Sequence, residues 1–421
     1  MAEKPDYSWI YTILPLSAVG SGLSIIIPIY ILDLGGTVFD VGVAFALYSL
    51  ISIPASILWG KVTDDSGMTK ELILLSLLGT FPIIAIMYLL DHVATLQITY
   101  ALFAFVATAA SPAINIMLMG EKRDPSLPKY FSRYSIWAIG GTLLAFLPGY
   151  FVTSAYIKMY LVLLLLLNLS ALVLALTLIR DRHVRTTSTT RGLVSLFFAP
   201  FNMLTHVPNV LTTISLTKRI HETIDGTGLN GTAALLVSVA LFSLGMNLFN
   251  TSYIPFLRAF GLSYSNIFSI NIFNAVGQVS VYAIVLLLAR RIDLHRYYHA
   301  SVFLRCACYL LVMLPLFFLT GAFFYVNILA YVIGGFAYAL WNVTASVMIY
   351  DHIRGKNKGY YVGLWVAIIG ASTVLGAFGS GVISAQLGYM YTFVLAIAVT
   401  LLSVTSFIRA RLGYYKGVVR V

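Results

Sequence analysis

The sequence predicts an all-α integral membrane protein with twelve transmembrane helices in two six-helix bundles and with both termini in the cytoplasm. Three observations lead to this fold class: an apolar composition, apolar runs long enough to cross a bilayer, and basic residues confined to alternate loops. Hydrophobic residues make up 60% of the 421 residues and charged residues only 10%. In a soluble domain about a quarter of the residues are charged, so the expected solvent of this chain is lipid.

A spanning helix needs about 20 largely apolar residues. By this criterion six helices are predicted before a polar gap, at residues 9–33, 37–60, 70–91, 94–119, 131–154 and 156–180. Six more are predicted after the gap, at residues 231–258, 264–290, 297–320, 323–350, 359–385 and 388–410. The first apolar run is not followed by a small-residue cleavage pattern, so we expect it to be retained as a helix.

The predicted helices divide the chain into an N-terminal bundle (1–180), a cytoplasmic linker (181–230) and a C-terminal bundle (231–421). Within the linker, apolar residues recur at helical spacing, at Leu193, Leu196, Phe197, Phe201 and Leu204. This spacing predicts a short amphipathic helix on the membrane surface or against the bundle. We interpret the linker as a tether, and a functional role for its helix stays open.

The distribution of Lys and Arg predicts the orientation, because loops rich in these residues face the cytoplasm. One set of loops and the C-terminal tail carry Lys61, Lys70, Lys122, Arg123, Lys129, Arg290, Arg291, Arg296, Arg354, Lys356, Lys358, Arg411 and Lys416. The opposite loops carry only Lys158 and Arg258. Both termini are therefore predicted to be cytoplasmic, and the net charge of +11 is interpreted as a topology signal rather than as a nucleic-acid-binding surface.

Two short segments recur in the two halves of the chain. Residues 59–64, after the second predicted helix, resemble residues 288–293, after the eighth. Glu121 closes the fourth helix as Asp351 closes the tenth, each followed by bases. An acid at a helix C-terminus opposes the helix dipole, so both acids are expected to have basic partners or neighbouring helix N-termini. Internal similarity of this kind is typical of transporters built from repeats.

The segment after the second predicted helix resembles the loop motif of the major facilitator superfamily. In that family, Gly is followed after three residues by Asp, then by a base, one residue, Gly and further bases; Gly60, Asp64, Gly67 and Lys70 match. Asp65 stands where the family has a base, so a charge contact typical of the motif is missing or replaced. In topology, the resemblance covers the whole chain.

The resemblance implies two bundles that rock about a central site, so that a cavity opens alternately to each side of the membrane. It also implies that the motif latches the cytoplasmic gate, with Asp64 against the start of the eleventh helix near Lys358 and Gly359. The alternative is a tight cytoplasmic turn with no gating role. The gating candidates are Gly60, Asp64, Gly67, Glu121 and Asp351.

Polar side chains recur on single faces of several predicted helices, as with Asn271, Asn274 and Gln278 at i, i+3 and i+7 of the eighth. Polar groups are costly in hydrocarbon and tend to face the bundle interior or a water-filled cavity. The substrate-binding candidates are Asn115, Trp137, Asn247, Asn250, Asn271, Asn274, Gln278, Trp341, Asn342 and Trp365. The alternative is interhelical packing, to which such contacts contribute about 0.6 kcal/mol on average.

Two arginines lie nearest to the hydrocarbon region. Arg133 opens the fifth helix near the expected cavity and is a candidate contact for an anion. Arg305 lies about two turns into the ninth helix, which the resemblance places at the periphery. We therefore expect the Arg305 side chain to extend to the cytoplasmic headgroups.

The sequence favours a secondary transporter that moves a small organic solute across the cell membrane. One alternative is a proton-coupled exporter of hydrophobic or drug-like compounds, which the partial resemblance of Leu147-Pro148-Gly149 to the Gly-Pro pattern of the family's exporters favours. The absence of Asp, Glu and His from the middle of every span counts against that exporter. A second alternative is a non-transporting receptor or scaffold.

No metal-ligand cluster, nucleophile motif or phosphate loop is recognisable, so we expect neither an enzyme nor a cofactor. Cys306 and Cys308 are two apart and point away from each other on a helix, which disfavours a disulfide. The expected partners are a small-molecule substrate and the lipid bilayer, with no nucleic acid, and the protein is expected to act as a monomer. The sequence leaves the substrate, the direction of transport and any ion coupling open.

Overall fold

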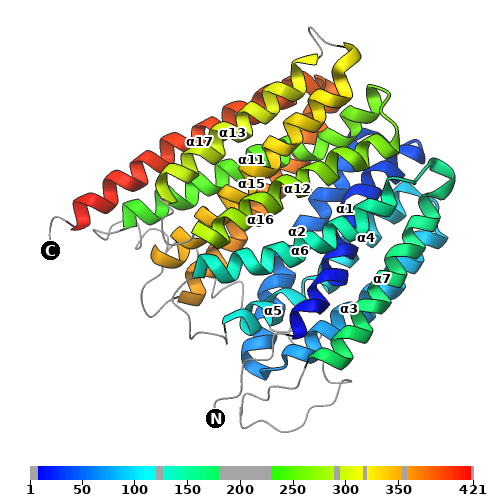
Figure 1. Cartoon of the computed structure of the whole chain (residues 1–421), viewed down its shortest axis with the longest axis horizontal. Helices are drawn as coiled ribbons and strands as arrows, with labels where there is room; N and C mark the ends of the chain where they lie inside the picture. Colours follow the sequence, from blue (N-terminus) through cyan, green and yellow to red (C-terminus); the bar gives the residue numbers. More distant parts are fainter. Residues whose placement is uncertain are drawn as a thin grey trace.

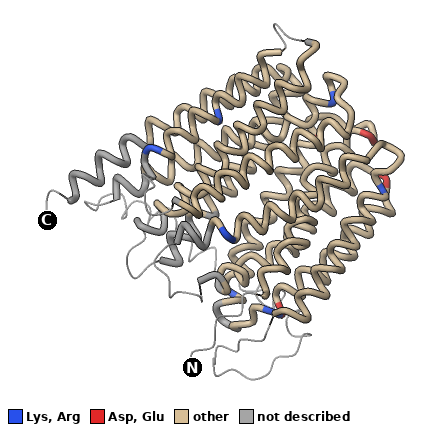
Figure 2. The backbone as a smooth tube through the Cα atoms, viewed as in Figure 1, with Lys and Arg blue, Asp and Glu red and all other residues tan. Residues whose placement is uncertain are grey.

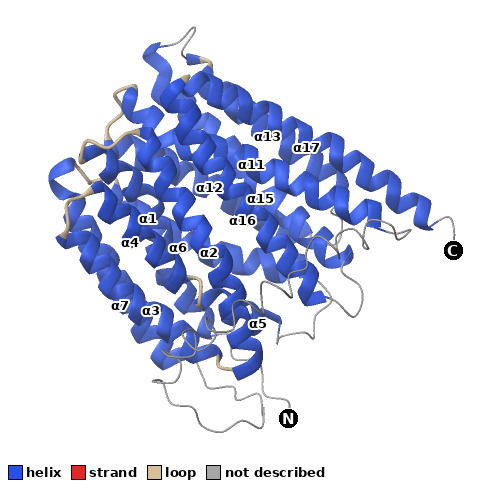
Figure 3. Cartoon of the chain, turned by 180° about the vertical axis from the view of Figure 1, so that it is seen from behind, coloured by secondary structure: helices blue, strands red, loops and turns tan. Residues whose placement is uncertain are grey.

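The computed structural model describes residues 8–119, 127–179, 229–288, 294–315, 320–352 and 358–418. These residues form helices joined by short turns, and no strand occurs among them (Figure 3). Ten helical segments of this part of the chain are long and apolar enough to cross a membrane. The predicted class of an all-helical membrane protein is confirmed. The predicted linker helix at 193–204 lies outside the described residues.

The helix boundaries follow the predicted spans closely. Before the linker the helices are α1 (Ile13–Asp33), α2 (Val38–Ser66), α3 (Thr69–Leu89), α4 (Val93–Ala107), α5 (Ala110–Met119), α6 (Leu127–Gly149) and α7 (Ile157–Leu178). After it they are α11 (Leu229–Ala259), α12 (Tyr264–Leu288), α13 (Leu294–Met313), α15 (Phe323–His352), α16 (Lys358–Gln386) and α17 (Tyr389–Val418). Short 3-10 helices precede α1, α7 and α15, at Ser8–Thr12, Ser154–Tyr156 and Thr320–Ala322.

The second helix is longer than predicted, because α2 continues from Gly60 to Ser66. Gly67 ends it in a left-handed conformation, with φ of 66°, and its N–H donates to the Thr63 carbonyl at 2.9 Å. A side chain would be strained at this φ, which is why glycine terminates the helix here. Most of the expected motif loop is therefore helical.

The fourth predicted helix is divided into α4 and α5. Pro112 lies in the first turn of α5, where it has no N–H to donate to the Thr108 carbonyl. The chain forms 3-10-type hydrogen bonds here, which span three residues instead of four. They run from Ala109 N to Val106 O at 3.1 Å and from Ser111 N to Thr108 O at 3.2 Å. The proline thus explains the break.

The helices pack in two sets that meet along two seams (Figure 1). In the first set α1 packs against α6 and α7, α2 against α4, and α3 against α4 and α7. In the second set α11 packs against α16 and α17, and α15 against α12 and α13. The seams between the sets are formed by α2 with α16 and by α6 with α12.

The helices converge at one end of the molecule and fan out toward the other, where α17 ends (Figure 1). We call the converging end, which carries the turns after α1, α3, α6, α11 and α16, the distal end. Figure 2 shows that the described charged residues gather mainly near the helix ends. The apolar middle of the helices and their charged ends match the layers of a bilayer.

Glycine allows α1 and α6 to approach closely. A Cβ at Gly141 would collide with the backbone carbonyl of Leu14 on α1. At the adjacent Gly140, the nearest atom to a Cβ would be Leu14 Cδ1, at the ordinary distance of 3.8 Å. Small residues at such crossings permit the backbone contact that holds helices together in lipid.

Replacing Gly141 with alanine is expected to lower the free energy of unfolding by about 1–3 kcal/mol, because α6 must move away from α1. The measurement is the thermal unfolding midpoint of the purified protein in detergent. Gly140→Ala is the matched control and should keep or raise the midpoint, since alanine favours a helix by about 1 kcal/mol over glycine. Equal midpoints for the two variants would contradict the packing argument.

Candidate functional site

The seam between α2 and α16 is closed near the distal end. A Cβ at Gly42 would lie 2.8 Å from the Cα of Gly381 and 2.9 Å from the Ala377 carbonyl oxygen, so the two backbones touch there. Phe39 and Phe378 stack edge-to-face beside this point, with ring centroids 6.1 Å apart. The contact involves small and apolar groups, and none of these five residues forms a hydrogen bond across the seam.

A polar contact joins the two helix sets at the same end. Asp33, at the end of α1, accepts a hydrogen bond from the Tyr264 hydroxyl at the start of α12. Arg258 Nη2, near the end of α11, lies 3.9 Å from Asp33 Oδ1. The guanidinium stacks over the Tyr264 ring, with Cζ 4.3 Å from its centroid, and Nη1 donates to the Leu262 carbonyl at 3.1 Å. We call Asp33, Arg258 and Tyr264 the distal contact.

A second ion pair lies within the first helix set. Lys158 Nζ donates to Asp91 Oδ2 at 2.7 Å, and the Tyr30 hydroxyl donates to Asp91 Oδ1 at 2.5 Å. The hydrogen bond from Lys158 and that from Tyr30 hold the pKa of the Asp91 carboxyl below its ordinary value. The two bases that the sequence places opposite the basic loops, Lys158 and Arg258, are therefore both paired with acids.

Arg305 is buried inside the second helix set, with 3% of the residue exposed. Its Nε donates to the Tyr309 hydroxyl at 2.9 Å, its Nη1 to the Gly334 carbonyl at 3.2 Å, and its Nη2 to Asn250 Oδ1 at 2.7 Å. The expectation that Arg305 extends to the headgroups is wrong. Its side chain instead connects α13 to α15 and α11, and we call these four residues the Arg305 network.

Two predicted amides lie beside the Arg305 network. Asn274 Nδ2 on α12 donates to the Tyr331 carbonyl at 2.8 Å, and Gln278 Nε2 donates to Asn274 Oδ1 at 2.7 Å. A Cβ at Gly334 would lie 3.3 Å from Arg305 Nη1 and 3.7 Å from Asn274 Nδ2. The glycine therefore lets both polar groups approach the backbone of α15.

Three other predicted amides connect helices or bond to their own helix. Asn247 Nδ2 donates to the Ser243 carbonyl at 2.8 Å and to Thr373 Oγ1 on α16 at 3.2 Å. Asn342 Nδ2 on α15 donates to the Tyr282 hydroxyl on α12 at 2.9 Å. Asn271 Nδ2 donates to the Ile267 carbonyl at 2.8 Å. These bonds give the three amides a packing role in this conformation.

The predicted tryptophans and the remaining polar candidates are spread over several helices. Trp137 on α6 is half-buried and meets Tyr11 edge-to-face at 5.0 Å. Trp341 on α15 is buried and stacks on Phe242 at 4.7 Å, and the half-buried Trp365 packs near it. Asn115 on α5, Arg133 on α6 and Asn250 on α11 have exposed side chains.

The gating candidates lie at the end opposite the distal contact. Gly60 and Asp64 belong to the last two turns of α2, and Gly67 is its C-cap. Asp351 belongs to the last turn of α15. The side chains of Asp64 and Asp351, and the whole of Glu121, lie outside what the structure describes.

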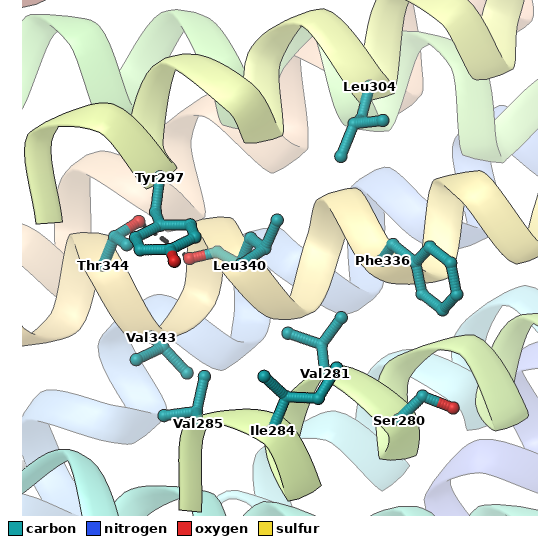
Figure 4. Close-up of a pocket in the computed structure, with 10 residues that line it drawn as sticks. All are labelled: Ser280, Val281, Ile284, Val285, Tyr297, Leu304, Phe336, Leu340, Val343 and Thr344. Atoms are coloured by element: carbon teal, nitrogen blue, oxygen red, sulfur yellow. Dashed lines mark hydrogen bonds between the residues drawn. The ribbon is translucent and has the colours of Figure 1, made fainter. Parts of the chain in front are cut away.

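A pocket of about 260 Å³ lies between α12, α13 and α15 and contains none of the predicted site residues (Figure 4). Its walls are mostly apolar, with Leu304, Phe336 and Leu340 among them. Two of its polar groups are satisfied by their own helices, since Thr344 Oγ1 donates to the Leu340 carbonyl at 2.7 Å and Ser280 Oγ to the Val276 carbonyl at 2.9 Å. The pocket offers little for recognising a polar solute.

Sequence reasoning underrated Arg305 and did not find the distal contact. Two signals for Arg305 were present: Tyr309 follows it at i+4, and Gly334-Gly335 marks a close approach on α15. The pairing of Asp33 with Arg258 and Tyr264 joins residues more than 220 positions apart, so it depends on how the two helix sets meet.

Comparisons with known proteins identify one family model and several structures of similar fold. A family model described as Major Facilitator Superfamily matches residues 12–354. No curated protein sequence matches the chain. Among solved structures, the nucleoside transporter NupG is similar, with a TM-score of 0.71 and 13% identity over 96% of this chain and 98% of that one.

Two further structures have the same fold. One is a variant of the peptide transporter POT in complex with sulfate, with a TM-score of 0.70 and 13% identity over 96% of this chain and 94% of that one. The other is the human organic anion transporter MFSD10 (TETRAN), with a TM-score of 0.64 and 14% identity over 97% of this chain and 100% of that one. At such low identity, these likenesses show a shared fold.

The lowered pKa of Asp91 predicts how stability depends on pH. The carboxyl of Asp91 binds its proton more weakly in the folded than in the unfolded protein. Its contribution to the free energy of unfolding is therefore complete above the ordinary Asp pKa of about 3.9. The contribution is lost as the pH falls through the lowered folded value. The midpoint difference between the native protein and Asp91→Asn should therefore be constant from about pH 5 to 8 and shrink in stronger acid.

The measurement is thermal unfolding in detergent across this pH range. Lys158→Gln removes the hydrogen bond that lowers the pKa of Asp91 the most. The difference between its unfolding midpoint and that of the native protein should shrink over the same acidic interval. A difference for Asp91→Asn that persists unchanged at acidic pH would contradict the ion-pair explanation.

Proposed function

This chain belongs to the major facilitator superfamily, a family of membrane transporters, and we propose that it moves a small organic solute across the cell membrane by alternating access. The observation that carries the proposal is the close contact of the two helix sets at the distal end, combined with the spreading of the helices toward the opposite end. They meet at the distal end through the distal contact and the Gly42–Gly381 crossing, while the helices fan out toward the other end (Figure 1). This arrangement corresponds to a carrier closed on its distal side.

The closed end is built from groups that separate at modest cost. An ion pair at a helix end regains water when it opens, and such partly exposed pairs contribute about 0–1 kcal/mol. The glycine crossing is smooth because neither Gly42 nor Gly381 has a side chain to interlock. Weak, smooth contacts suit a seam that must open and close during each transport cycle.

We assign the whole chain to two six-helix bundles, at 1–180 and 231–421, joined by the linker at 181–230. In this assignment α6 and α13 also cross the membrane, in addition to the ten apolar segments. Their positions support it, because α6 packs against α1 and α12, and α13 against α15 and α17. The positions of the basic residues support an orientation with both termini in the cytoplasm and the distal end outside.

The solute binds between the two bundles, against polar and aromatic groups of both. Support comes from side chains that are exposed although they belong to membrane-spanning helices, Asn115 in the first bundle and Asn250 in the second. Trp137 on α6, and Asn274 and Gln278 on the neighbouring α12, are further candidates, as are Trp341 and Trp365 in the second bundle. The similar structures include transporters of nucleosides, peptides and organic anions, which are small organic solutes.

The cytoplasmic gate is formed by the end of α2. Gly60, Asp64 and Gly67 match the family motif, and Glu121 and Asp351 close equivalent helices in the two halves. In the conformation that is open to the outside, Asp64 meets the positive N-terminal end of α16, which begins at Lys358. The gate and the distal contact would then close in turn.

Joining the two bundles at the distal end is expected to stop transport. In the variant with Phe39→Cys and Phe378→Cys, a short bifunctional thiol reagent fixes α2 to α16 where their rings now lie 6.1 Å apart. A thermal-shift screen of sugars, nucleosides, amino acids, organic anions and drug-like cations first supplies a ligand, because ligands that bind the folded state raise its stability. Uptake of that ligand into reconstituted vesicles should fall to background after cross-linking, and chemical cleavage of the cross-link between the two cysteines should restore it.

Each single-cysteine variant is the control and should retain uptake after the same treatment, since the native Cys306 and Cys308 are buried. Full uptake by the cross-linked protein would contradict alternating access. A ligand that binds but that no variant moves would favour the receptor interpretation.

Proton coupling is tested separately. Since no Asp, Glu or His lies in the middle of a predicted span, uptake is expected to be indifferent to an imposed pH gradient. Uptake and internal pH are measured together in the same vesicles. Proton movement accompanying solute flux would revive the proton-coupled exporter.

A further inference from the structure

Arg305 carries a positive charge that none of the described acids neutralises. Residues 229–418 contain only two carboxylates, Asp293 and Asp351. Asp293 and the side chain of Asp351 lie outside what the structure describes, and Arg305 itself is eleven residues, about 16 Å of helix, from the start of α13 at Leu294. Among the residues that the structure describes, no acid forms an ion pair with Arg305.

Such a charge is costly to keep. A buried cation without a counter-charge is strongly unfavourable, and ionisable residues in membrane spans are characteristic of substrate and ion pathways. A guanidinium has five N–H donors, and Arg305 directs three of them to Tyr309, Gly334 and Asn250. These neutral acceptors stabilise the cation but leave its charge uncompensated.

Asn250 connects this charge to an exposed surface. Arg305 has only donors, so the Asn250 oxygen must face it, and the Asn250 amide NH₂ is left for another partner. Asn250 is exposed, and no hydrogen bond from its Nδ2 is recorded among the described residues. The Asn250 NH₂ is therefore an available donor, polarised by the guanidinium behind it.

We propose that the transported solute carries an anionic group, such as a carboxylate or phosphate, that binds to the Asn250 amide and neutralises Arg305. This inference rests on the proposed transport function and specifies its substrate class. A negative charge beside Asn250 interacts with the guanidinium through little water, where Coulomb attraction is much stronger than in solution. A neutral solute of the same shape lacks that attraction.

The test compares anions with uncharged molecules of similar shape. Thermal unfolding of the purified full-length protein is measured against benzoate and benzamide, indole-3-acetate and indole-3-acetamide, and inorganic phosphate. At least one anion is expected to raise the midpoint at concentrations where its neutral counterpart does not. Stabilisation by no anion, or equal stabilisation by acid and amide, would overturn the proposal.

Two substitutions locate the effect. Arg305→Gln is expected to reduce the preference for the anion over the amide by about thirtyfold or more. Asn250→Asp places a carboxylate within ion-pair distance of Arg305, so it should keep the fold, maintain or raise the midpoint without ligand, and abolish anion binding. This second variant decides the question even if Arg305→Gln does not fold.

Lys158→Gln removes a positive charge at the distal end and is the matched control, in which the anion preference should be unchanged. An anion preference that survives Asn250→Asp, or that is lost in Arg133→Gln instead, would overturn the assignment to Arg305. Vesicle uptake separates the two proposals. Uptake of neutral solutes alone would overturn the anionic substrate class and preserve the transport function. Anions that bind but never cross the membrane would support the anion site and overturn the transport function.

Discussion

A lipid bilayer supplies no water to satisfy polar groups, and the structure of this chain depends on that constraint. Backbone groups must be bonded within helices, so the described chain is helical and its turns lie at the helix ends. Helices cannot be driven together by burial of apolar surface, because lipid is as apolar as they are. Close backbone contact at Gly141 and Gly42, and hydrogen bonds such as that from Asn247 to Thr373, provide the association instead.

The same constraint separates two kinds of polar residue. Asn247, Asn271 and Asn342 have their amide donors satisfied by helices and contribute to packing. Arg305 and Asn250 differ. The charge of the Arg305 guanidinium is not cancelled by its neutral acceptors, and the exposed amide NH₂ of Asn250 remains available as a donor. The free-energy cost of burying Arg305 is part of the cost of folding and is not incurred again on binding. A solute that binds beside Asn250 therefore gains the attraction of the guanidinium without that cost.

The predicted helix positions agree with the structure because hydrophobic length is a local property. The predicted second helix ends at Gly60, whereas in the structure it continues to Ser66 and Gly67 sets its end. Arg305 differs from its predicted position for a related reason. Snorkelling is the usual behaviour of an arginine near a membrane surface, and only the acceptors on α11, α13 and α15 make the buried position favourable.

The sequence by itself determined the membrane class, the helical repeat of polar residues and the motif after the second helix, because each depends on residues close together in the chain. Only the tertiary structure decided which amides bond to neighbours and which remain exposed, and where the two helix sets touch. The distal contact joins Asp33 to Tyr264, and the Arg305 network joins three helices. Such contacts depend on the crossing of distant helices, which the spacing of residues along one helix does not specify.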